Sequence, residues 1–250
     1  MAGAGGAPWP PPAQDLCQRG ASPVSRATRR YDAVLFDWDD TLCYAEPHRF
    51  LHAREVARHF GLDIPLPEIY QAFIRAGDSG FDDWARFCAR LPVEFGVDPD
   101  QQASFVHAYR IREVYRRFQL FEDVLEGIDG LVARDLRVGL ISNNTEVAVH
   151  AAALNVTHHF EVVVSPLTYR VAKPHPEIFA RALAQMEVEP ERAIYVGDSY
   201  DNDVVGARAV GMLPVLVDRF AVHDDAVDAE HRVTGFTELL ALLDRLLAPE

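Results

Sequence analysis

Continuous apolar runs alternate with amphipathic segments along most of the chain. The strands that these runs predict lie at 32–37, 136–141, 162–164, 193–196 and 213–217. The segments with a helical period lie at 123–134, 145–154, 176–187, 201–210 and 236–247. This alternation is typical of a parallel sheet with helices on both faces. It predicts an α/β fold with a Rossmann-like core.

A purely helical pattern interrupts this alternation after the first predicted strand. The candidate helices lie at 48–60, 66–76, 81–90 and 99–118. Gly61 and Gly77 are stop signals for the first two, Leu91-Pro92 closes the third, and proline opens the fourth. We therefore expect a core formed by residues 30–44 and 119–250, with an all-helical domain at 45–118 inserted into it.

The ends and the composition of the chain limit its environment. Residues 1–29 are rich in Pro, Ala and Gly and lack a period, so we expect a disordered extension. The sequence has neither a run of about eighteen apolar residues nor a signal-peptide core. Its three scattered cysteines suit a reduced protein, and a cytoplasmic location is expected. The net charge of −14 argues against a nucleic acid or an anionic membrane as partner.

Polar side chains follow three of the predicted strands at the point where each strand ends. Asp37 and Asp39 follow the first strand, Ser142 the second and Asp198 the fourth. Ligands of open parallel α/β sheets bind just beyond the carboxyl ends of the strands, so these residues should converge. Lys173 lies in a loop after the third strand and can reach the same edge.

Four carboxylates gathered at this edge would repel one another: Asp37, Asp39, Asp198 and Asp203. Lys173 alone supplies too little positive charge to keep them ionised. A hard divalent cation with oxygen ligands solves this problem, and Mg²⁺ is the usual choice where a phosphate also binds. Asp201, in the same loop, is interpreted as a helix N-cap.

The remaining polar groups suit a phosphoryl group. Ser142 offers a hydroxyl, Asn143 an amide and Lys173 a positive charge for the phosphate oxygens. Capping of the helix that begins near Thr145 is a second role open to Ser142 and Asn143, and it is compatible with the first. Together with the carboxylates, these residues predict a phosphoryl-transfer site.

Four motifs of the sequence resemble those of a known family. DWDDT at 37–41, Ser142 after its apolar run, Lys173-Pro174 and GDSYDND at 197–203 resemble the motifs of the haloacid dehalogenase-like hydrolase superfamily. They occur in the same order and span residues 32–217. The resemblance implies a phosphatase with a small helical cap, formed here by 45–118.

The resemblance also implies a role for each motif residue. Asp37 would attack phosphorus and form an aspartyl-phosphate. Asp39 would protonate the leaving alcohol and later activate water. Ser142 and Lys173 would bind the phosphoryl group. Mg²⁺ would be held by the Asp37 carboxylate, the Asp39 backbone carbonyl, Asp198 and, through the outer shell, Asp203.

Several alternatives within and outside the family stay open. The acid at position 39 favours phosphatase chemistry over carbon–halogen hydrolysis, whereas phosphomutases share all four motifs. A binding module that has kept the fold without useful catalysis is a third hypothesis. Asp40 stands where many members have glycine, and we expect this to change nothing essential.

The cap is expected to close over the site, exclude water and read the substrate. A small phosphomonoester is therefore predicted, such as phosphoglycolate, a sugar phosphate or a nucleotide. Five cap residues are candidates for substrate contact but are interpreted as surface or packing residues: His48, Arg49, Arg75, Trp84 and Arg86.

Overall fold

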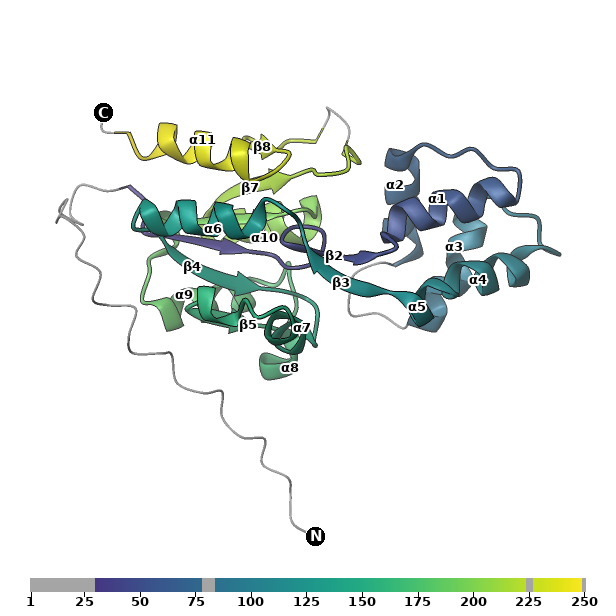
Figure 1. Cartoon of the computed structure of the whole chain (residues 1–250), viewed down its shortest axis with the longest axis horizontal. Helices are drawn as coiled ribbons and strands as arrows, with labels where there is room; N and C mark the ends of the chain where they lie inside the picture. Colours follow the sequence, from purple (N-terminus) through teal and green to yellow (C-terminus); the bar gives the residue numbers. More distant parts are fainter. Residues whose placement is uncertain (1–29, 78–83, 224–226, 249–250) are drawn as a thin grey trace, which may run out of the picture.

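The core of the molecule is a six-stranded sheet with strand order β5-β4-β1-β6-β7-β8, and every pairing in it is parallel. The computed structural model (Figure 1) describes residues 30–77, 84–223 and 227–248. The strands are β1 Ala33–Phe36, β4 Arg137–Ile141, β5 Val162–Val164, β6 Ala193–Gly197, β7 Leu213–Val217 and β8 Arg232–Val233. The predicted α/β class is confirmed. The extension predicted at 1–29 lies outside the described residues.

Helices cover both faces of this sheet. They are α6 Val124–Ala133, α7 Val147–Ala153, α8 Pro166–Tyr169, α9 Pro176–Met186, α10 Gly206–Val210 and α11 Phe236–Leu246. Alternate residues of β1 belong to different apolar clusters. Val34 and Phe36 pack with α6, α7 and α11, whereas Ala33 and Leu35 pack with α9 and α10. Burial on both faces explains why the strand is apolar without a break.

A separate group of helices follows β1 and has its own apolar core. These helices are α1 Arg49–His59, α2 Leu66–Ala76, α3 Trp84–Glu94, α4 Gln102–Arg110 and α5 Arg112–Tyr115. Phe50, Phe73 and Phe105 are among the residues buried between them. The antiparallel strands β2 (Cys43–Glu46) and β3 (Arg117–Leu120) join this group to the sheet, as Figure 1 shows. Among the described residues, none of the helices is long and apolar enough to span a bilayer.

The fourth predicted helix differs most from the structure. It was expected to run from Pro99 to Phe118, but α4 begins at Gln102, α5 ends at Tyr115 and Phe118 lies in β3. The β3 residues are exposed and half-buried in alternation, because the strand pairs with β2. Pairing with a distant segment overrides the helical period here.

Smaller differences concern element ends. Helix α3 continues through Pro92 to Glu94 instead of closing at Leu91-Pro92, and Pro92 is buried within it. The helix predicted at 201–210 begins with a π-helical turn at Tyr200–Val205. The two-residue strand β8 has too short a run to be recognised in the sequence.

Candidate active site

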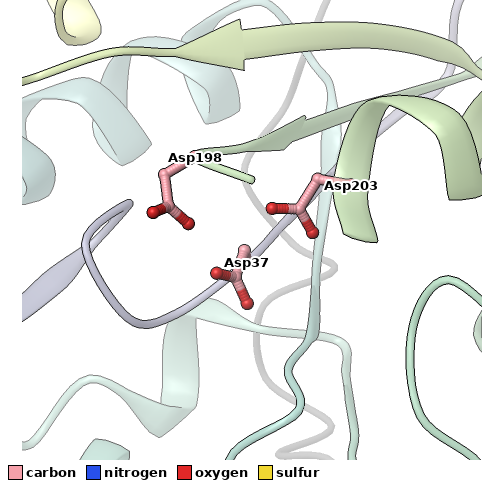
Figure 2. Close-up of side chains that lie close together, drawn as sticks. All are labelled: Asp37, Asp198 and Asp203. Carbon is pink, nitrogen blue, oxygen red and sulfur yellow. The ribbon is translucent and has the colours of Figure 1, made fainter. Parts of the chain in front are cut away.

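Three carboxylates from two neighbouring strand ends converge at the carboxyl edge of the sheet. Asp37 follows β1, whereas Asp198 follows β6 and Asp203 lies in the helical turn after it. One carboxylate oxygen of each lies within 4.8 Å of the others. Figure 2 shows the three side chains lying close together. The structure thus brings together three of the four acids predicted to share a site.

Lys173 contacts two of the three carboxylates of this cluster. Its Nζ lies 2.6 Å from Asp37 Oδ1, 2.6 Å from Asp203 Oδ1 and 3.1 Å from the Tyr195 hydroxyl. Burial alone would lower the pKa of Lys173, but the charges of Asp203 and Asp37 outweigh it and raise the pKa above its usual value. Lys173 is therefore a fixed positive charge at the predicted phosphoryl position.

Asn143 holds the backbone of Lys173. Its Nδ2 donates to the Lys173 carbonyl at 3.0 Å, and its Oδ1 accepts from the Lys173 N–H at 2.7 Å. The sequence assigned this amide to the phosphoryl group directly. In the structure both of its polar atoms contact the main chain of Lys173, so the amide acts on the site through the lysine.

Asp39 is not one of the three grouped carboxylates. Its carboxylate accepts from Asn144 Nδ2, at 3.1 Å from Oδ2 and 3.4 Å from Oδ1. Burial, and then the negative charge of Asp40, raises the pKa of Asp39 to about 6. A carboxyl group with such a pKa can both donate and accept a proton near neutral pH, as a general acid and base must.

Asn144 is a functional residue that the sequence analysis missed. Besides contacting Asp39, it donates its backbone N–H to Ser142 Oγ at 3.0 Å. Ser142 is buried at the end of β4. Asn144 therefore positions the hydroxyl and the predicted acid together. The sequence signal for Asn144 was its position directly after Ser142-Asn143. Hydrophobic periodicity does not identify polar residues of this kind.

The donor set fits a divalent cation such as Mg²⁺. Burial raises the pKa of Asp37 to about 7, although Lys173 partly offsets this effect. Burial and the nearby charges of Asp40 and Asp37 raise the pKa of Asp198 well above its usual value. Two buried carboxylates and the half-buried Asp198, with one lysine beside them, lack positive charge, and oxygen donors are what Mg²⁺ prefers.

Asp40 has a role that the sequence analysis did not foresee. It adopts a φ of 60°, and its carboxylate lies 2.9 Å from His48 Nε2 and 2.8 Å from Arg49 Nε. Burial would raise the pKa of Asp40, but the Arg49 charge and the His48 contact outweigh it and lower the pKa. Asp40 thus ties the loop that carries Asp37 to the beginning of α1.

A cavity of about 550 Å³ opens onto these groups. Its walls include Asp37, Asp39, Ser142 and Lys173 from the sheet edge, and a second set from the helical segment. That second set includes Arg49, Tyr70, Trp84, Tyr109, Arg112 and Arg116. Arg49 and Trp84 therefore face the cavity, in contrast to the surface or packing roles expected for them.

The comparisons with known proteins agree with this geometry. The family model described as haloacid dehalogenase-like hydrolase matches residues 31–211. The glyceraldehyde 3-phosphate phosphatase of Methanopyrus kandleri is 29% identical over 202 residues, covering 77% of this chain and 86% of that protein.

Two further similarities cover more of the chain. Haloacid dehalogenase-like hydrolase domain-containing protein 3 of Bos taurus is 29% identical over 241 residues, covering 87% of this chain and 96% of that protein. The crystal structure of a HAD family hydrolase from Deinococcus radiodurans superposes with a TM-score of 0.65 at 23% identity, covering 89% of this chain and 100% of that one.

Proposed function

The chain belongs to the haloacid dehalogenase-like hydrolase family, and from this premise we propose that it is a Mg²⁺-dependent phosphatase acting on a small phosphomonoester. The observation that carries the proposal is the position of Lys173 Nζ, 2.6 Å from both Asp37 and Asp203 beside the cavity. A buried lysine beside a nucleophilic carboxylate is the charge that an incoming phosphoryl group requires. The phosphatase activity of the Methanopyrus kandleri relative supports this choice.

Transfer begins with Asp37. One of its carboxylate oxygens attacks phosphorus, the bond from phosphorus to the substrate oxygen breaks, and Asp39 donates a proton to the departing alcohol. Lys173 and the Ser142 hydroxyl stabilise the charge on the phosphoryl oxygens. The product of this half-reaction is an aspartyl-phosphate and a free alcohol.

Hydrolysis of that intermediate regenerates the enzyme. Asp39, now ionised, takes a proton from a water molecule that attacks phosphorus, and the bond to Asp37 breaks to release phosphate. Asp37, the Asp39 carbonyl and Asp198 would hold Mg²⁺, with Asp203 supporting them. When bound, the cation supplies positive charge that lets the nucleophile and the phosphate approach each other.

Replacement of Asp37 with Asn tests the proposal. With p-nitrophenyl phosphate and Mg²⁺, the wild type should release inorganic phosphate and the variant should not, because an amide is not a competent nucleophile. Asp201→Asn is the matched control and should retain wild-type turnover, since Asp201 is exposed in the nearby helical turn Tyr200–Val205. Turnover by Asp37→Asn at the wild-type rate would refute the assignment. Measuring free phosphate also separates hydrolysis from isomerisation by a phosphomutase.

A further inference from the structure

A second charged cluster lies on the helical side of the cavity. Arg112, Glu113 and Arg116 all line it, together with the carboxylates and Lys173 at the sheet edge. Arg112 Nη1 lies 2.8 Å from Glu113 Oε1, and Arg116 Nη1 lies 3.0 Å from Glu113 Oε2. Two guanidinium groups share one carboxylate, so these three residues carry one net positive charge.

Arg112 is the fixed member of this cluster. Its side chain is buried, and its Nε donates to the Pro47 carbonyl at 2.7 Å. This contact joins the end of the helical segment to its beginning. An arginine held by its Nε and Nη1 atoms has lost its conformational freedom before any ligand arrives, which lowers the entropic cost of binding.

Arg116 is the more accessible member. Its side chain is 39% exposed, and its guanidinium lies over the Phe118 ring at 5.4 Å from the ring centroid. Phe118 also lines the cavity. The aromatic ring thus supports the guanidinium at the cavity wall, while the exposed part of the group can meet a solute.

The chemistry of the cavity is therefore different on its two sides. In the proposed mechanism, Lys173 and Ser142 at the sheet edge bind the reacting phosphoryl group. The Arg112–Glu113–Arg116 cluster has no part in that reaction, yet it faces the same volume of about 550 Å³, which is typical of a small-ligand site. Guanidinium groups match carboxylate and phosphate oxygens in geometry and charge.

We propose that the substrate carries a second anionic group, which binds Arg112 and Arg116 while its phosphoryl group lies at Asp37 and Lys173. The inference rests on the proposed phosphatase function and narrows its substrate class. Phosphorylated acids and bisphosphates belong to this class, whereas phosphorylated alcohols and simple sugar monophosphates lack the second anion.

Matched substrate pairs test the inference and distinguish the two anions. In one pair 3-phosphoglycerate is compared with glycerol phosphate, and in the other fructose 1,6-bisphosphate with fructose 6-phosphate. In at least one pair, the compound with the second anionic group should exceed its partner in kcat/KM by roughly 10- to 100-fold, the effect of one or two charge-assisted hydrogen bonds. The pair that shows the preference identifies the second anion as carboxylate or phosphate.

Substitution of Arg116 by Gln should reduce that preference toward unity, mainly through KM of the anionic member. Because Arg112 also holds Pro47, Arg112→Lys is the milder second variant, and it should lower the same ratio. Arg110→Gln is the control, since Arg110 is exposed on α4 and does not line the cavity. It should leave the ratio unchanged.

The experiment distinguishes failure of the second-anion inference from failure of the phosphatase proposal. Equal kcat/KM values within both pairs, or a preference that survives in both Arg116→Gln and Arg112→Lys, would overturn the inference while leaving the phosphatase proposal intact. Absence of phosphate release from all four compounds and from p-nitrophenyl phosphate would overturn the proposed function and this inference with it.

Discussion

Replacement of Asp40 with glycine tests whether the loop that carries Asp37 stabilises the position of the helical segment. The Asp40 carboxylate contacts His48 Nε2 at 2.9 Å and Arg49 Nε at 2.8 Å. Its backbone has a φ of 60°, in the left-handed region that glycine adopts without strain. The variant therefore removes both contacts and leaves the course of the loop unchanged.

The expected loss of stability follows from the exposure of each partner. The His48 side chain is 2% exposed, so loss of its acceptor leaves a buried polar group unsatisfied and costs about 1–3 kcal/mol. Arg49 is 28% exposed and can be rehydrated, so its pair contributes about 0–1 kcal/mol. Relief of the left-handed conformation, about 1 kcal/mol, is offset by the greater entropy of the unfolded glycine chain. The net effect is about 2 kcal/mol, or a fall in Tm of about 4–8 °C.

Thermal unfolding followed by circular dichroism measures this loss. Asp40→Asn retains an acceptor for His48 and should lose less than Asp40→Gly. Asn155→Gly is the control for the backbone, because Asn155 is exposed and has a similar φ of 55°. It should shift Tm little. If Asp40→Gly has the same Tm as the wild type, the contacts of Asp40 do not stabilise the connection between the loop and α1.

Three further predictions concern the acidic cluster. Gly197→Ala should lower turnover by at least about tenfold, because the added Cβ would lie 2.3 Å from Asp203 Cγ; a fully active variant would show that Asp203 has room to move. His223→Ala should raise the Mg²⁺ concentration needed for half-maximal phosphate release, since His223 Nε2 lies 2.7 Å from the Asp198 carbonyl; an unchanged metal requirement would exclude such positioning. Treatment with EDTA should stop phosphate release and added Mg²⁺ should restore it, whereas persistent activity in EDTA would contradict metal dependence.

The convergence of Asp37, Ser142 and Asp198 could be predicted because of the kind of strands that deliver them. Each follows a buried parallel strand, and β4, β1 and β6 are neighbours in the sheet. Apolar runs without polar interruptions identify such strands from sequence alone. Since all their carboxyl ends meet at one edge, the order of residues along the chain was enough to bring these side chains together.

The antiparallel pair β2 and β3 could not be predicted in this way. Phe118 continues the helical spacing of Val114 and Tyr115, but those two residues are 74% and 69% exposed. The apparent stripe is therefore not a buried face. Four-residue strands that pair across more than seventy intervening positions, Cys43 with Leu120, leave no periodic signal in either segment alone.

The three acids of DWDDT show why proximity in sequence does not establish a shared role. Asp37 contacts Lys173, Asp39 contacts Asn144, and Asp40 turns toward α1. Asp40 has a left-handed φ, and its carboxylate contacts His48 and Arg49. A backbone angle of this kind is not encoded by residue type alone.

Contacts at both ends of the helical segment involve residues that line the cavity. Asp40 holds Arg49 where the chain enters the segment, and Arg112 donates to the Pro47 carbonyl where the chain leaves it. Both arginines line the cavity that contains Asp37. Arg49, which contacts Asp40 of the core, and Arg112, which joins the two ends of the helical segment, therefore both face the cavity in which the substrate is proposed to bind. For this reason, a substitution that weakens either connection should change substrate affinity as well as stability.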